Sequence, residues 1–148
     1  MKKHRFFAFS IALCLSVLAL CGCSSQPEME RLEAPAQEDF VLSVELQNDT
    51  VQKGESFVLE CSLENRSGRN YHIHHLPEII SYSYNGDSEY RLAMGNVSDF
   101  LDGEEITRTI EIPAVESGTI TVTADFEVEL NTGTVPYTYS QDFEVTVE

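Results

Sequence analysis

The length, composition and charge of the chain limit what it can be. Its 148 residues leave room for one domain, and a hydrophobic content of 42% is ordinary for a folded protein. The formal net charge is −16, and Lys2, Lys3 and Arg5 precede Cys23 whereas every acidic residue follows it. A chain beginning at Cys23 therefore carries six basic and 25 acidic residues, about −19 in formal charge. Such a surface repels phosphate backbones and anionic lipid, so nucleic acid is excluded as a partner and a soluble monomer is expected.

The N-terminus has the features of an export signal. Three of residues 2–5 are Lys or Arg, and residues 6–20 then run without a charged side chain. An apolar core of that length is typical of a signal peptide and is short for a transmembrane span. It predicts that the protein leaves the cytoplasm.

The next four residues, Leu20-Cys21-Gly22-Cys23, resemble the lipobox of bacterial lipoproteins. The resemblance implies cleavage between Gly22 and Cys23 and a diacylglycerol thioether on Cys23, with no other cofactor. Cys21 is a rival site, but the bulky Leu20 before it does not suit the signal peptidase. A secretory signal without lipidation is the alternative. Because two or more acyl chains give stable anchoring, we expect a lipid anchor in the cell membrane and a domain outside the cytoplasm. Ser24 would permit the outer membrane if the cell is Gram-negative.

Residues 23–39 are expected to form a lipidated N-terminus followed by an acidic flexible linker. Residues 24–39 read SSQPEMERLEAPAQED, with two prolines, five acidic side chains and no apolar alternation. A linker of this kind would hold a folded domain clear of the lipid headgroups.

From Phe40 onward, apolar and polar residues alternate with the period of half-buried β-strands. The alternation predicts strands at residues 40–46, 57–64, 70–76, 79–84, 89–93, 106–112, 120–130 and 137–147. The fourth and fifth would form a hairpin around a turn at residues 85–88. Seven or eight strands without helical periodicity predict an all-β fold, an antiparallel immunoglobulin-like β-sandwich over residues 40–148. A small open barrel would produce the same pattern.

The features that mark antibody domains are missing from this sandwich. The chain has no Trp, and Cys61 is its last cysteine, so no disulfide can form within the predicted domain. Cys61 shares a strand face with Leu59 and Leu63. We therefore expect a buried, unreactive thiol with a raised pKa.

Three short motifs link the predicted domain to known families. Leu63-Glu64-Asn65 ends one strand, Leu101-Asp102-Gly103-Glu104 precedes another, and Gly118 begins the longest one ahead of Val122 and Ala124. In these motifs the domain resembles the immunoglobulin-like domains of bacterial surface lipoproteins, and it is similar to the bacterial intracellular proteinase-inhibitor family. The second resemblance implies a protease-inhibitor-like module. The export signal departs from an intracellular inhibitor, and no inhibitory loop can be matched.

The third predicted strand carries a pair of histidines that could bind a metal ion. His72 and His74 would lie on one strand face about 6.5–7 Å apart, a spacing that can share one ion. The strand should pair with residues 120–130, whose outward carboxylates include Glu127. We take His72, His74 and Glu127 as candidate metal ligands. Two solvated histidines ion-paired with those acids are the alternative.

Two further groups are candidates for contact or binding sites. Tyr82, Tyr84 and Tyr90 surround the predicted hairpin turn and could form a contact patch, or could pack on one another across the strands. Asp99, Asp102, Glu104 and Glu105 form an acidic loop. Their spacing is not that of a calcium loop, so a solvated loop is expected.

These patterns together favour a binding function over catalysis. Neither a nucleophile with its base, nor a metal triad, nor a phosphate loop is evident, so we do not expect an enzyme. The sequence predicts a lipid-anchored, non-catalytic binding or accessory module for an envelope protein or glycan. A metal-binding accessory lipoprotein using His72 and His74 is the alternative.

Overall fold

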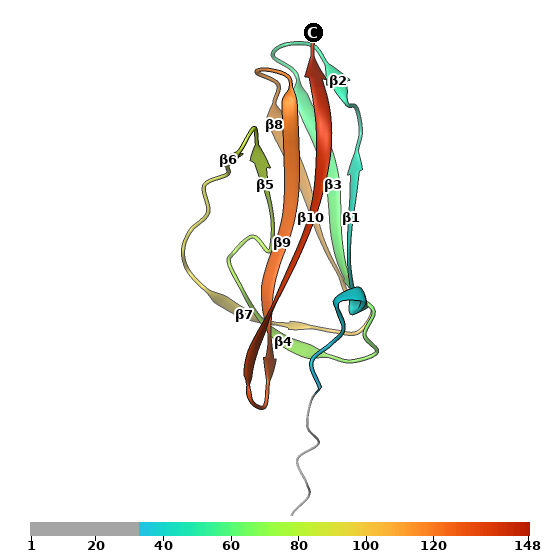
Figure 1. The fold of residues 1–148 in the computed structure, drawn as a ribbon, viewed down its shortest axis with the longest axis vertical. Helices are drawn as coiled ribbons and strands as arrows, with labels where there is room; N and C mark the ends of the chain where they lie inside the picture. The colour runs from blue at the N-terminus through green and yellow to red at the C-terminus, as the bar shows by residue number, and fades with distance from the viewer. Residues whose placement is uncertain (1–32) are drawn as a thin grey trace, which may run out of the picture. The chain divides into compact units, whose positions relative to one another are not determined.

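The computed structural model describes residues 33–148 and is built almost entirely of strands (Figure 1). They are β1 (Phe40–Leu46), β2 (Thr50–Val51), β3 (Ser56–Asn65), β4 (Tyr71–His75), β5 (Ile80–Tyr84), β6 (Asp87–Ser88), β7 (Asn96–Phe100), β8 (Glu105–Pro113), β9 (Gly118–Leu130) and β10 (Gly133–Val147). One 3-10 turn, η1 (Gln37–Asp39), precedes them. No helix in this part of the chain is long and apolar enough to cross a bilayer.

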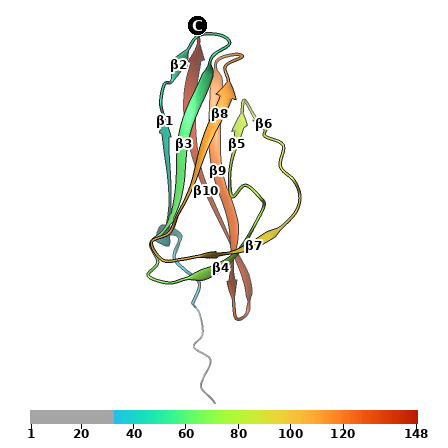
Figure 2. The same cartoon turned by 180° about the vertical axis from the view of Figure 1, so that it is seen from behind.

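The strands form two sheets that enclose one core (Figures 1 and 2). One sheet has the order β1-β3-β8, and the other has the order β2-β10-β9-β4-β7, with β5 paired to β9 and β6 paired to β5. The short β2 runs parallel to β10, and every other pair is antiparallel. The predicted immunoglobulin-like sandwich is confirmed, and the open barrel is wrong because the three-stranded sheet pairs with neither edge of the other.

β4 and β5 are two parts of one strand position, and both pair with β9. Ile73 lies opposite Val128, and Ile80 lies opposite Ala124. The chain thus advances seven residues while β9 advances four, so three extra residues bulge out of the ladder. Pro77 lies in this bulge, where its missing N–H removes no ladder hydrogen bond. The predicted pairing of the third strand with residues 120–130 is confirmed.

The predicted hairpin is much shorter than expected. β5 turns at Asn85 and Gly86, whose φ angles of 52° and 86° suit a type I′ turn, but β6 has only two residues. The chain then leaves the ladder at Glu89, whose carboxylate oxygens lie 2.6 and 2.7 Å from the guanidinium of Arg108 on β8. The strand predicted at residues 89–93 is therefore wrong. The unpredicted β7 pairs with β4 instead.

Aromatic rings close the end of the sandwich at which the chain enters β1. The ring centroid of Phe40 lies 5.0 Å from that of Phe126 and 5.3 Å from that of Tyr137, both edge-on. Phe40 also stacks on Phe100 at 5.7 Å and meets Tyr71 at 6.0 Å. Each such pair contributes about 0.5–1.5 kcal/mol beyond the area it buries. Because Phe40 belongs to one sheet and its four neighbours to the other, the rings join the sheets without a disulfide.

The folded body begins earlier than predicted, at Pro35. Pro35 is buried, and its carbonyl accepts a hydrogen bond of 2.6 Å from the hydroxyl of Tyr137. The carbonyl of Gln37 accepts one of 2.8 Å from Tyr139, and burial raises the pKa of both tyrosines. The prediction of a flexible linker reaching residue 39 is therefore wrong for residues 35–39, whose backbone is held by β10.

Asn65, at the end of β3, is buried with 0% exposure and is fully hydrogen-bonded. Its amide nitrogen donates to the carbonyls of Phe100 at 3.0 Å and Arg69 at 2.9 Å. Its amide oxygen accepts from the backbone N–H and the hydroxyl of Ser67 at 3.1 and 2.6 Å. One side chain thus joins the β3–β4 loop to β7.

We expect Asn65→Ala to lower the free energy of unfolding by about 2–4 kcal/mol, because it removes four hydrogen bonds and takes one donor from the buried carbonyl of Phe100. Urea denaturation followed by circular dichroism measures the change. Asn96→Ala is the matched control, since Asn96 is exposed and should change the stability by less than about 0.5 kcal/mol. Equal effects of the two substitutions would show that the Asn65 network does not hold the loops.

Candidate interaction surfaces

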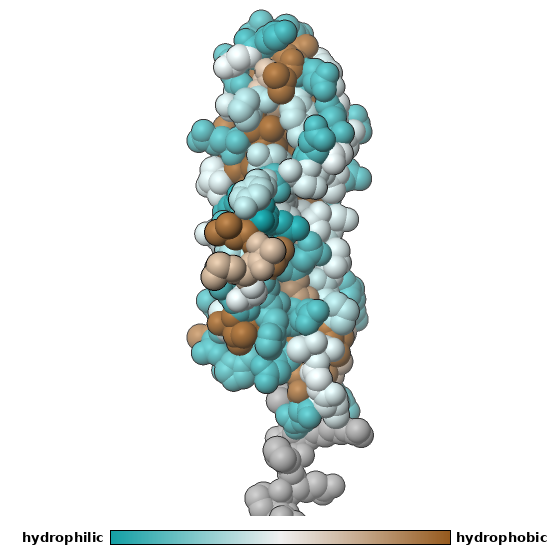
Figure 3. Space-filling model, turned by 90° about the vertical axis from the view of Figure 1, so that its left-hand side faces the viewer, coloured by the Kyte–Doolittle hydropathy of each residue, from teal (hydrophilic) through white to brown (hydrophobic). Residues whose placement is uncertain are grey.

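Exposed apolar side chains gather on the connection between β6 and β7. Among residues 33–148 the exposed large hydrophobic residues are Tyr90, Leu92, Met94, Val97, Leu101 and Val115. The first four lie within eight residues, and Tyr90 and Met94 are 88% and 68% exposed. Figure 3 views the side of the molecule that carries this connection, where brown apolar atoms stand out among hydrophilic ones. We call residues 90–97 the apolar segment.

The apolar segment is anchored at its start, its residues 90–95 lie outside the sheets, and Asn96 and Val97 begin β7. The N–H of Glu89 donates to the carbonyl of Tyr82 at 3.1 Å, and residues 90–95 form no strand. The guanidinium of Arg108 binds the Glu89 carboxylate with two nitrogens, which raises the pKa of Arg108. Arg91 lies 4.0 Å from Asp125, at the limit of an ion pair. The segment therefore presents its side chains to solvent between a fixed start and β7.

The three tyrosines of the predicted contact patch do not lie together in the structure. Tyr82 and Tyr84 pack against the core, and the Tyr84 ring meets Phe57 edge-on at a centroid distance of 6.2 Å. The Tyr84 hydroxyl donates to the carbonyl of Glu116. Tyr90 is exposed and belongs to the apolar segment rather than to a cluster with the other tyrosines. Tyr90, Leu92 and Met94 alternate with other residues as they would in a strand. In the structure they form an exposed apolar run instead.

His72 and His74 lie on the outer face of β4, as predicted, and each meets a carboxylate of a different strand. His72 Nδ1 lies 2.6 Å from Asp99 of β7, and His74 Nε2 lies 3.0 Å from Glu129 of β9. Glu127 is opposite His74 in the ladder. Within residues 33–148 no three potential ligands come together as a metal site. Each of the two histidines therefore lies against a carboxylate of its own, and the ligand set His72, His74 and Glu127 stays a prediction.

The acidic loop predicted to be solvated is a structured turn between β7 and β8. Asp102 accepts a hydrogen bond of 2.8 Å from the N–H of Gly68, and Glu104 accepts one of 2.7 Å from the N–H of Leu101. These carboxylates therefore fix the turn, which is exposed to solvent as predicted.

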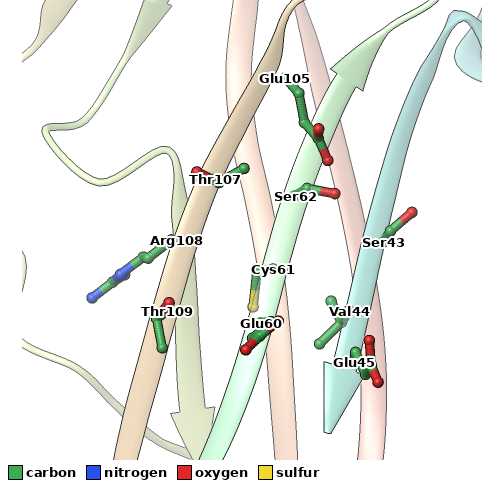
Figure 4. Close-up of a pocket in the computed structure, with 10 residues that line it drawn as sticks. All are labelled: Ser43, Val44, Glu45, Glu60, Cys61, Ser62, Glu105, Thr107, Arg108 and Thr109. Carbon is green, nitrogen blue, oxygen red and sulfur yellow. The ribbon is translucent and has the colours of Figure 1, made fainter.

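The outer face of the β1-β3-β8 sheet is acidic. Glu45 lies directly opposite Glu60, and Glu64 lies directly opposite Glu105. Like charges in directly opposed positions destabilise a sheet. A groove of about 360 Å³ follows this face, and Figure 4 shows the glutamates, serines and threonines that line it. Arg66, whose guanidinium lies 2.5 Å from Glu64, compensates one of these charges.

Cys61 is buried below this face with 3% exposure. Burial raises the pKa of the thiol to about 11, and the nearby charge of Arg108 opposes that shift more weakly. Because the thiolate is the reactive form, the side chain has the properties of the inert core residue that the sequence predicted.

Comparison with known proteins gives distant structural likenesses. No family model matches the chain, and no curated protein sequence matches it. The CARDB domain of a Pyrococcus furiosus protein, solved with di-metal ions, is 15% identical over 74% of this chain and 88% of that one, with a TM-score of 0.47. The sporulation control protein Spo0M of Bacillus subtilis is 13% identical over 74% of this chain and 49% of its own, with a TM-score of 0.38. A β-glucosidase of Listeria innocua matches over 73% of this chain but 16% of its own, at 20% identity and a TM-score of 0.36. At these values no activity or ligand carries over to this chain.

We expect the Cys61 thiol to resist alkylation in the folded protein. At pH 8 a thiol with a pKa of about 11 is roughly 0.1% ionised, against about a quarter for a free cysteine, so reaction with iodoacetamide should slow by at least about 100-fold. Peptide mapping by mass spectrometry measures labelling at this residue, with the urea-unfolded protein as the reference. Labelling of the folded protein at the unfolded rate would contradict the buried assignment.

Proposed function

We propose that the protein is a lipid-anchored component of a bacterial cell envelope whose immunoglobulin-like domain is a non-catalytic binding module. The partner is an envelope protein or glycan. The observation that carries this proposal is the apolar segment, which exposes four large hydrophobic residues on a body with 23 acidic and five basic residues between positions 33 and 148. A highly charged domain gains nothing in solubility from such a run, whereas exposed apolar patches mark contact sites.

The anchor in this proposal rests on the sequence Leu20-Cys21-Gly22-Cys23, and it lies outside the described residues. Twelve peptide steps separate Cys23 from Pro35, where the fold begins. At about 3.3–3.6 Å per residue, the tether reaches at most about 40 Å. The domain would therefore work close to the outer surface of the membrane that holds the lipid.

The two other hypotheses lack a supporting observation in the described part of the chain. The metal-binding alternative needs His72 and His74 to share an ion, and among residues 33–148 no third ligand is gathered with them. The inhibitor-like alternative needs a loop that can be matched to an inhibitory one, and no loop of the domain can be matched in this way. Binding through the apolar segment requires neither a shared metal ion nor an inhibitory loop.

We expect Cys23→Ala to abolish lipidation and to leave unprocessed precursor in the cell, because the modified thiol is lost. Membrane fractionation and intact-mass measurement detect the missing lipid and the uncleaved signal. Cys21→Ala is the matched control and should leave both lipidation and cleavage unchanged. A Cys23→Ala protein that is still processed and still held at the membrane would contradict the anchor.

We expect the double variant Leu92→Ser, Met94→Ser to lower the yield of crosslinked partner in intact cells by at least about fivefold, since removing large apolar side chains from an interface costs about 1 kcal/mol or more. A photoreactive residue at Val97 reports the contact. Leu101→Ser is the control, because Leu101 is also a large apolar residue and 48% exposed but lies outside the segment. All three substitutions are at exposed positions and should change the stability by less than about 0.5 kcal/mol each. If the control lowers the yield as much as the double variant, the segment is not the contact site.

A further inference from the structure

β8 is a long edge strand whose outer backbone groups are unpaired. Among the strands of residues 33–148 it hydrogen-bonds to β3 alone, and Figure 2 shows it at the margin of the three-stranded sheet, with β5 of the other sheet beyond it. Two hydrogen bonds at the ends of the β3–β8 pair show which residues of β8 bond to β3: the N–H of Asn65 donates to the Glu104 carbonyl at 3.0 Å, and the N–H of Ala114 donates to the Glu55 carbonyl at 2.9 Å. Because hydrogen-bonded pairs alternate along an antiparallel ladder, the backbone groups that bond to β3 are those of Ile106, Arg108, Ile110 and Ile112. The residues between them turn their N–H and C=O groups outward.

The outward-facing residues are Glu105, Thr107, Thr109 and Glu111. Their four N–H and four C=O groups have no partner among residues 33–148. Such a row of unpaired groups is a template onto which another strand can add. Two β8 edges meeting antiparallel around Arg108 would place Glu105 of each copy opposite Glu111 of the other. In that register, like-charge repulsion works against self-association at this edge.

The two sides of the edge differ in chemistry. On the outer side, Glu105 begins the strand and lines the acidic groove together with Glu60 (Figure 4), and Glu111 lies near the other end of β8. On the inner side, an open pocket of about 290 Å³ lies between the Ile112 end of β8 and the β5–β6 hairpin. Its lining is mixed, with apolar groups of Tyr82, Tyr84, Ile112 and Val115 beside the acidic Asp87, Glu89 and Glu116.

We propose that β8 binds an extended, basic segment of a partner protein, which adds to the sheet as a fourth strand. Lysine or arginine side chains of that segment lie along the acidic outer face, and alternate valine or isoleucine side chains face inward, where those at the Ile112 end reach the pocket. Three observations support this occupant: the unpaired backbone groups, the glutamates of the outer face, and the pocket at the Ile112 end of the strand with its apolar and acidic lining. The proposal names a partner class for the binding module and rests on that proposed function.

The test uses the full chain, purified in detergent micelles, and a synthetic nonapeptide in which lysine or arginine alternates with valine. We expect saturable binding in a fluorescence anisotropy titration. A peptide N-methylated at alternate amides should bind at least about tenfold more weakly, because it cannot form the backbone bonds. A peptide of the same composition with its basic residues grouped together should weaken similarly. Equal binding by the parent and the N-methylated peptide would overturn the inference without any variant of the protein.

Substitutions in the chain then locate the site. Thr109→Pro removes one outward N–H and no bond to β3, so it should weaken binding about fivefold or more while the circular dichroism spectrum is kept. Glu105→Gln with Glu111→Gln should weaken binding about three- to tenfold at low salt. Glu127→Gln is the matched control on the other sheet and should change affinity less than about twofold. Either of two results would refute a basic partner strand at β8. One is binding that neither Thr109→Pro nor the double glutamine variant affects, and the other is a dimer of the protein that disappears in Thr109→Pro. If the apolar segment still captures a partner in that case, the binding module stands and the β8 inference fails alone.

Discussion

The packing of Phe40 among four rings of the opposite sheet is the interaction on which the rest of the molecule depends. A sandwich of this size without a disulfide must hold its sheets together mainly through side-chain burial. Phe40 is the first residue of β1, so its ring fixes the start of that strand against β4, β7, β9 and β10 at once. The same placement brings Pro35 and Gln37 to the hydroxyls of Tyr137 and Tyr139. The entry of the chain is therefore part of the core rather than an appendage to it.

The long strands could be predicted from the sequence because each of them has one face in the core. In β3, β8 and β9 the side chains alternate between buried and exposed over nine or more residues, and that alternation is visible without a structure. The candidate thiol followed from the same pattern, since Cys61 shares its face with Leu59 and Leu63. The strand face on which a residue lies can thus be predicted from the sequence when the strand is long and half-buried.

The errors arose where side-chain contacts outweigh local pattern. Tyr90 and Leu92 alternate like strand residues, but the bond between Glu89 and Arg108 takes the chain away from β5 before they are reached. β7 has a single buried hydrophobic residue, Phe100, and its Asp99 suggested a loop. Residues 35–39 have the composition of a linker, yet two tyrosine hydroxyls more than 100 positions away hold them. Contacts between residues so distant in sequence leave no periodic signal in a single sequence.

Arg108 connects the two surfaces that this structure offers to partners. Its backbone belongs to β8, next to the outward-facing edge residues, while its guanidinium holds Glu89, at which the apolar segment begins. The guanidinium also donates to the carbonyl of Ile80, so it ties β8 to β5 across the open side of the sandwich. Because the Arg108 and Glu89 side chains are only 28% and 12% exposed, solvent screens this bond less than it screens a pair on the surface. A rigid bond between the two elements fixes the position of the apolar segment relative to the free edge. A partner that used both surfaces would then meet them in one fixed arrangement, and would lose little entropy in ordering the module.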